Sequence, residues 1–137
     1  MTGLVVCVLV LAAASAYGVL RQRRSGRVAV RVRDGGKRLD AAELGQGLGE
    51  RATLVQFSSA FCAPCRATRR VLAEVAAVVP GVAHVEIDAE HHLDLVRRLD
   101  ILKTPTVLVL DADGRIVRRA AGQPRKADVI AALGEAV

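Results

Sequence analysis

Aromatic side chains are scarce in this sequence of 137 residues, which has no tryptophan, one tyrosine and two phenylalanines. Proteins that hold single-stranded nucleic acid stack its bases on aromatic rings, so the composition argues against that function. A hydrophobic core must be built from Val, Leu, Ile and Ala instead, which suits the buried strands of an α/β domain. The excess of Arg, Ala and Val is typical of GC-rich coding and hints at a bacterial source.

Acidic residues are fewer than basic ones, with 14 Asp and Glu against 20 Lys and Arg and a formal net charge of +6. Most of the excess lies in residues 21–38, where eight basic residues accompany a single acid, Asp34. Beyond Asp40 the charges balance. A cluster confined to one segment is not the stripe of positive charge that follows a phosphate backbone, so we expect no nucleic-acid partner.

Charge is absent from residues 3–20, an apolar run long enough, at ~1.5 Å per residue, to cross most of a bilayer. We interpret this run as an uncleaved transmembrane anchor. One alternative is a secretory signal peptide, for which Ala14-Ser15-Ala16 offers a cleavage pattern, and another is a core helix of a soluble protein. The absence of basic residues before the run, and the arginine cluster directly after it, oppose the signal peptide.

The same arginine cluster predicts how the anchor is oriented. Basic residues next to a membrane span favour the cytoplasmic side, so we expect a single-pass protein of the cell membrane with its domain in the cytosol. Cys7 lies in the middle of the apolar run and is interpreted as a small apolar side chain.

Past the basic segment the chain has room for one domain, in which strand-like and helix-like patterns alternate. We predict strands at 28–32, 53–57, 84–88, 106–110 and 115–119, and helices at 40–48, from Cys62 to about 79, around 95–99 and at 126–133. Asp40 and Glu43 resemble a capping box, and Asp111-Ala112-Asp113-Gly114 indicates the turn of a hairpin. The alternation predicts right-handed crossovers and a largely parallel sheet edged by that hairpin.

Cysteine is rare, and Cys62 and Cys65 form the one C-x-x-C pair, where a predicted strand ends and a helix begins. The pair can be a redox dithiol, half of a metal site or a structural disulfide. Zinc needs four ligands, and the spacing of His84, His91 and His92 does not supply the missing ones, so we expect no metal. A structural disulfide across two residues removes little chain entropy. We therefore favour the redox dithiol.

The position of the pair at a helix start carries chemical consequences. Unpaired N–H groups and the positive end of the helix dipole stabilise a thiolate at Cys62, and Arg66 is near enough to add to this effect. Cys65 lies about one turn further along, where it can resolve a mixed disulfide. Pro64 occupies the first turn, in which its missing N–H costs nothing.

Three stretches of the chain resemble the thioredoxin family, and the resemblance covers roughly residues 37–135. They are TLVQFSSAFCAPCRATRRVL at 53–72, HVEID at 84–88 and DILKTPTVLVLDADGRIVRRAAG at 100–122. The resemblance implies a thioredoxin-like α/β fold, with a central mixed sheet flanked by helices, over residues 37–137. The anchor at 3–20 and a basic juxtamembrane segment at 21–36, which includes the first strand, would precede it.

The resemblance also implies a substrate-binding surface beside the dithiol. Pro105 would be cis, and the exposed backbone of Thr104 would pair with an extended segment of substrate. Gly122 matches the glycine that leaves room for substrate near the thiols. The alternative for Pro105 is a trans proline at the start of an edge strand.

Four positions depart from the family pattern. Phe61 stands where the family usually has Trp and Ala63 where it usually has Gly, and both keep the loop apolar and tightly turned. Gln56 takes the place of a buried acid that accepts a proton from the second cysteine, although Gln cannot be a base. His84 takes the place of the Lys beside that acid. We expect either a Gln56–His84 hydrogen bond or a histidine satisfied elsewhere in the core.

The function implied is that of a thiol-disulfide oxidoreductase at the membrane, acting as a reductase of protein disulfides. Cys62 would attack and Cys65 would resolve, with no organic cofactor and with a separate, unidentified electron donor. One alternative is a domain on the extracytoplasmic face, serving envelope disulfides or haem-protein maturation, because membrane-bound members of the family often face that way. Another is a non-catalytic thioredoxin-fold module that docks a membrane partner.

Overall fold

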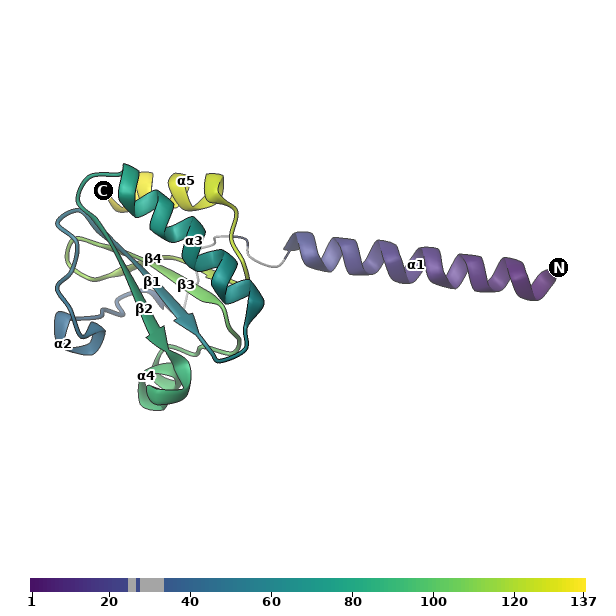
Figure 1. The fold of residues 1–137 in the computed structure, drawn as a ribbon, viewed down its shortest axis with the longest axis horizontal. Helices are drawn as coiled ribbons and strands as arrows, with labels where there is room; N and C mark the ends of the chain where they lie inside the picture. The colour runs from purple at the N-terminus through teal and green to yellow at the C-terminus, as the bar shows by residue number, and fades with distance from the viewer. Residues whose placement is uncertain (25–26, 28–33) are drawn as a thin grey trace.

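The computed structural model describes residues 1–24, 27 and 34–137, so the strand predicted at 28–32 lies outside the described residues. A long helix, α1 (Thr2–Arg24), precedes a layered domain and extends away from it (Figure 1). The domain has strands β1 (Ala52–Ser58), β2 (Val82–Asp88), β3 (Thr106–Asp111) and β4 (Ile116–Ala121). Its helices are α2 (Ala41–Leu44), α3 (Ala63–Val78), the 3-10 helix η2 (Ala89–His91), α4 (Leu93–Arg98) and α5 (Lys126–Ala136).

The described strands form a mixed sheet in the order β2-β1-β3-β4. Strand β2 runs parallel to β1, whereas β3 is antiparallel to both β1 and β4. The prediction of a largely parallel sheet is therefore wrong for the described residues, and the mixed sheet implied by the family resemblance is observed. The segment between β2 and β3 holds only the short helices η2 and α4, of three and six residues, and not the long crossover helix that usually joins parallel strands.

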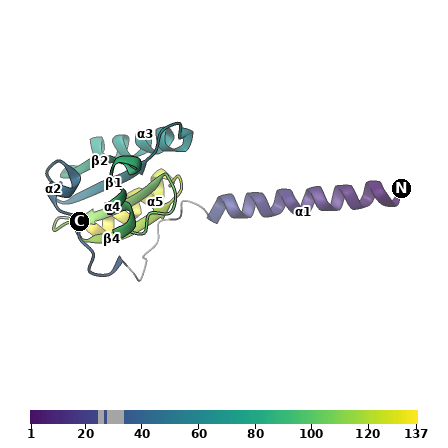
Figure 2. The ribbon, with the colours of Figure 1, turned by 90° about the horizontal axis from the view of Figure 1, so that it is seen from below.

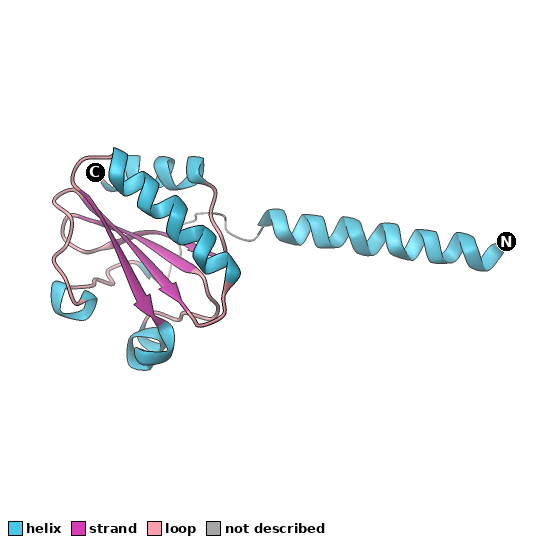
Figure 3. Cartoon of the chain, viewed as in Figure 1, coloured by secondary structure: helices cyan, strands magenta, loops and turns pink. Residues whose placement is uncertain are grey.

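Two apolar clusters pack on the opposite faces of the sheet. Helices α3 and α5 cover one face, where Leu72 and Val129 pack with Leu54 and Val107. The segments around α2 and α4 cover the other face (Figures 2 and 3). Strand β1 is buried along its whole length, which makes it a rigid support for the loop that follows Ser58.

Helix boundaries follow local capping signals. Asp40 is the N-cap of α2 and forms the predicted capping box with Glu43. This helix ends at Leu44 rather than near residue 48, because Gly45 adopts a left-handed conformation with φ of 72° that terminates it. The predicted hairpin is confirmed by the antiparallel pairing of β3 with β4.

Helix α1 is apolar along most of its length and carries Arg21, Arg23 and Arg24 in its last turn. Its best window has a mean hydropathy of 2.4, and none of that window is buried against the domain. The alternative that this run is the core helix of a soluble protein therefore does not agree with the structure. Length and composition permit a membrane span, and a signal sequence at the N-terminus would have the same features.

A buried ion pair fastens the start of the domain to the sheet. Arg119 on β4 donates from Nε and Nη2 to the two carboxylate oxygens of Asp34, at 2.8 and 2.7 Å. Both side chains are less than 10% exposed. Arg119 also donates to the carbonyl of Asp100. Because the guanidinium is held on three sides, residue 34 is a fixed point of the fold.

Candidate active site

The cysteine pair lies at the junction of β1 and α3, where it was predicted. Cys62 is the N-cap of α3 in an extended conformation, and its Sγ accepts a hydrogen bond from the N–H of Cys65 at 3.2 Å. The two sulfurs are bonded to each other, with the Cα atoms 5.2 Å apart. Cys62 is half-buried, whereas Cys65 is buried within the helix. The sulfur of Cys62 therefore occupies the place of a helix-capping acceptor, which favours a thiolate when the bond is reduced.

The residues around the pair form a tight, exposed turn. Phe61 has φ of 57°, in the left-handed region that an aromatic residue rarely adopts, and its side chain is fully exposed. Ala63 and Pro64 begin the helix and are also exposed. Both departures from the family pattern, Phe61 and Ala63, therefore lie on the surface of this turn.

The loop before β3 places a proline beside the dithiol. The Thr104–Pro105 peptide bond is cis, as predicted, and Pro105 is buried. The N–H of Gly122 donates to the carbonyl of Pro105 at 2.8 Å. Pro64, Thr104, Pro105 and Gly122 are among the residues that line one groove, to which the end of α1 also contributes, so the structure brings these four predicted site residues together. Gly122 has φ of 99°, a conformation that few residues other than glycine adopt.

Ser59 is a site residue that the sequence did not reveal. It follows β1 and its Oγ lies 2.7 Å from Oγ1 of Thr104, which is a normal distance for a hydrogen bond between hydroxyls. The contact joins the turn that carries the dithiol to the loop that carries the cis proline. A local sequence pattern could not predict this contact, because the two residues are 45 positions apart.

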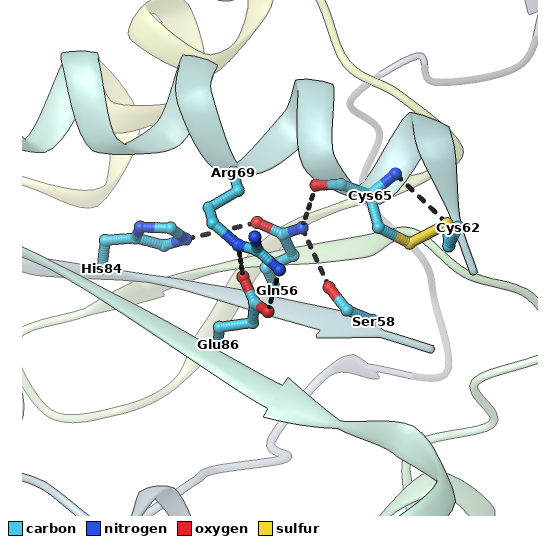
Figure 4. A network of polar contacts seen from close by, with 7 residues as sticks. All are labelled: Gln56, Ser58, Cys62, Cys65, Arg69, His84 and Glu86. Carbon is cyan, nitrogen blue, oxygen red and sulfur yellow. Dashed lines mark hydrogen bonds and ion pairs between the residues drawn. A yellow bond between two sulfur atoms is a disulfide. The ribbon is translucent and has the colours of Figure 1, made fainter. Parts of the chain in front are cut away.

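Beneath the dithiol helix, Gln56 is at the centre of a polar network (Figure 4). This side chain is fully buried on β1. Its Nε2 donates to the carbonyl of Cys65 at 2.8 Å and to Oγ of Ser58 at 3.0 Å. Its Oε1 lies 3.3 Å from Nε2 of His84, so the expected Gln56–His84 hydrogen bond is present.

The network determines which nitrogen of His84 carries a proton. Both N–H bonds of the Gln56 amide point to acceptors, one of which is the carbonyl of Cys65. The amide oxygen therefore faces His84, and Nε2 of that histidine must be the donor. His84 cannot accept a proton at Nε2 without losing this bond, which leaves Nδ1 as its basic atom.

Burial and a neighbouring ion pair set the charge of His84. Burial lowers the pKa of His84; the carboxylate of Glu86 raises it in part, and the guanidinium of Arg69 lowers it further. Arg69 binds Glu86 through Nε and Nη2, so the two opposite charges lie side by side along the network (Figure 4). Because its pKa is below the ordinary histidine value, His84 is neutral at neutral pH.

A metal site would need a cluster of ligating side chains within the part of the chain that the structure describes. There, no three His, Cys, Asp or Glu side chains lie close enough together to hold an ion. His91 and His92 lie near Asp88, at the end of β2, and contact it individually.

Solved structures share the fold. A mutant thioredoxin from Halobacterium salinarum is 20% identical with a TM-score of 0.58, over 64% of this chain and 75% of that one. Oxidised mitochondrial thioredoxin 3 from Saccharomyces cerevisiae is 17% identical with a TM-score of 0.55, over 63% and 79%. Chloroplastic thioredoxin z is 27% identical with a TM-score of 0.56, over 63% and 78%.

Relatives are also found by sequence. Thioredoxin from Mycolicibacterium smegmatis is 31% identical over 87 residues, which cover 61% of this chain and 77% of the relative. Thioredoxin H5 from Oryza sativa subsp. japonica is 26% identical over 72 residues, and the chain spans about half of its length, 53%. The family model named Thioredoxin matches residues 40–135, which hold the dithiol, the cis proline and the hairpin. The chain belongs to the thioredoxin family.

Proposed function

We propose that the chain is a membrane-tethered thiol-disulfide oxidoreductase that reduces disulfides of protein substrates. The observation that carries the proposal is the bonded Cys62–Cys65 pair at the N-terminus of α3, next to a groove that contains a cis proline. Thiols in this setting are reactive because the helix terminus stabilises the thiolate.

The chemistry proceeds in two exchanges. The thiolate of Cys62 attacks one sulfur of the substrate disulfide, whose S–S bond breaks, and the other substrate sulfur leaves as a thiolate that water protonates. The thiolate of Cys65 then attacks Sγ of Cys62 and releases the second substrate sulfur. Two electrons have then passed to the substrate, and the Cys62–Cys65 disulfide remains. A separate dithiol donor must return them.

The two cysteines differ in how they lose their protons. Cys62 is half-buried at the helix terminus, whereas Cys65 is buried and its thiol must lose a proton before it attacks. Gln56 contacts the carbonyl of Cys65 but has no basic atom to offer. Neutral His84, on the other side of Gln56, or a water molecule that reaches the network, is the remaining acceptor. Resolution of the mixed disulfide is therefore the slow step of this proposal.

The membrane location rests on α1. Its apolar length, its exposure and the basic residues of its last turn support an anchor that keeps the domain in the cytosol. The opposite orientation, in which the same dithiol serves envelope disulfides or haem-protein maturation, predicts the same chemistry with a different donor.

A turnover assay on the full chain in detergent tests the chemical proposal. With dithiothreitol as donor, the protein should reduce the disulfides of insulin, and Cys62→Ser should abolish this activity. A chain that binds no substrate and does not turn over would instead be the non-catalytic docking module. Wild-type activity no greater than that of the Cys62→Ser variant would overturn the proposal.

A further inference from the structure

The contact between Ser59 and Thr104 joins the two loops that form the candidate active site. Both side chains are half-buried, and their hydroxyl oxygens are 2.7 Å apart, so one hydroxyl donates to the other. Ser59 belongs to the turn between β1 and the dithiol, and Thr104 directly precedes the cis proline. A hydrogen bond here fixes the spacing between the two loops.

The backbone on both sides of Thr104 is also held. The carbonyl of Lys103 accepts a hydrogen bond from the hydroxyl of Thr106 at 2.6 Å. The carbonyl of Pro105 accepts one from the N–H of Gly122 at 2.8 Å. Thr104 thus lies between two fixed peptide groups, and the contact with Ser59 removes the freedom of its side chain.

The main chain of Thr104 remains available to a ligand. Within the described part of the chain its N–H and C=O have no hydrogen-bond partner, and the residue lines the groove beside Pro64 and Pro105. An extended peptide uses these two groups when it adds to an exposed backbone edge. Such pairing is strongest when the edge is already in its binding conformation, because no ordering entropy is then lost on binding.

We propose that Ser59 is a positioning residue for peptide substrates, acting through Thr104. Its hydroxyl holds the Thr104 side chain so that the N–H and C=O of Thr104 face the backbone of a substrate disulfide bound over Cys62. This inference rests on the proposed oxidoreductase function. To the extended substrate segment that the family resemblance implies, it adds a side chain that holds Thr104 in place. A small disulfide without a peptide backbone gains nothing from the contact.

The experiment compares two substrates across a set of hydroxyl deletions in the full chain. One substrate is an extended peptide containing a disulfide, and the other is the small aromatic disulfide 5,5′-dithiobis(2-nitrobenzoic acid). Ser59→Ala and Thr104→Val should each raise KM for the peptide about two- to tenfold, the range that corresponds to one neutral hydrogen bond. The kcat for the peptide should change less than KM, and any loss with the small disulfide should be smaller than the loss with the peptide.

Three further variants separate positioning from a general loss of structure. The double variant should be no worse than either single variant, because both remove the same bond. Ser59→Thr keeps a hydroxyl and should retain most of the peptide affinity. Thr68→Val is the matched control, since the Thr68 hydroxyl is buried in α3 with no partner among the described residues, and it should not change KM.

The outcomes distinguish this inference from the proposed function. A wild type that reduces both disulfides, with Ser59→Ala and Thr104→Val variants that show an unchanged peptide KM, would overturn the role of Ser59 alone. Equal losses on both substrates, or effects that add in the double variant, would also overturn it. A wild type that reduces neither disulfide would overturn both the function and the inference.

Discussion

Nε2 of His84 donates a hydrogen bond to Oε1 of Gln56, and this contact between neighbouring strands lies beneath the dithiol helix. The amide nitrogen of Gln56 in turn donates a hydrogen bond to the carbonyl of Cys65. A neutral amide and a neutral imidazole therefore fill the space under the buried cysteine. Gln56 thus bridges β1, β2 and the dithiol helix by hydrogen bonds, but it provides no carboxylate that could take the proton of Cys65.

Gln56→Asp should accelerate resolution of the mixed disulfide near neutral pH, because it introduces a carboxylate that can accept the proton of Cys65. It should also lower the free energy of unfolding by about 1–3 kcal/mol or more, because a buried charge would lack a cationic partner. Single-turnover kinetics on a preformed mixed disulfide measure the first effect, and chemical denaturation measures the second.

Gln56→Asn is the matched control for that experiment, since Asn has the shape of Asp without the charge. If Gln56→Asp and Gln56→Asn resolve the mixed disulfide at the same rate while folded, proton removal from Cys65 does not limit turnover. His84→Ala should slow resolution only if Nδ1 of His84 is the acceptor.

His84 should contribute to the pH dependence of stability. Burial lowers its pKa in the folded protein, so the unfolded chain binds the proton more readily. As the pH falls through the ordinary histidine pKa of about 6.5, protonation favours the unfolded chain and the free energy of unfolding decreases. Above that value this contribution is constant. Thermal melting of wild type and His84→Gln from about pH 8 to pH 5 should show a smaller loss of stability in the variant.

His92→Gln serves as the control for this titration because His92 is exposed after β2 and outside the Gln56 network. A difference between the His84→Gln and His92→Gln curves then reports the buried position of His84. Identical pH curves for wild type and His84→Gln would show that the proton equilibrium of His84 does not differ between the folded and unfolded states.

Cys65→Ser should trap protein substrates as mixed disulfides with Cys62. Attack needs only the thiolate of Cys62, whereas release needs a second thiolate that serine cannot provide. Non-reducing electrophoresis of cell extracts should show high-mass adducts that dithiothreitol removes. The double variant, in which Cys62 is also replaced by Ser, should show none, and an equal yield of adducts from it would assign them to another cysteine.

The arginine cluster should hold the domain in the cytosol. A fluorescent reporter that matures only in the cytosol, fused after Val137, should be bright in the wild type. Replacing the arginines of the cluster from Arg21 to Arg33 with Gln, and adding Lys before Gly3, should invert the orientation. An active periplasmic enzyme reporter at Val137 in the wild type would contradict the predicted orientation.

The sequence predicted the parts of the molecule that have local signals. Asp40 and Glu43 indicated a helix start, and the resemblance around Cys62 and Pro105 led to the dithiol turn and the cis proline. Strand direction was not predictable from alternation, because β3 has the same apolar pattern whichever way it runs. The Ser59–Thr104 contact was also hidden, since it arises from hydroxyls 45 positions apart that only the folded sheet brings together.

The ion pair between Asp34 and Arg119 limits the distance between the end of α1 and the domain that carries the dithiol. Asp34, which is fixed to β4, lies ten residue steps from Arg24 at the end of α1, and no conformation can separate the two residues by more than about 35 Å. With α1 embedded in a bilayer as proposed, the start of the domain therefore lies within that distance of the end of α1, close to the lipid surface. Disulfides near the lipid surface are then within reach of the dithiol, whereas disulfides deeper in the compartment must first diffuse to the membrane.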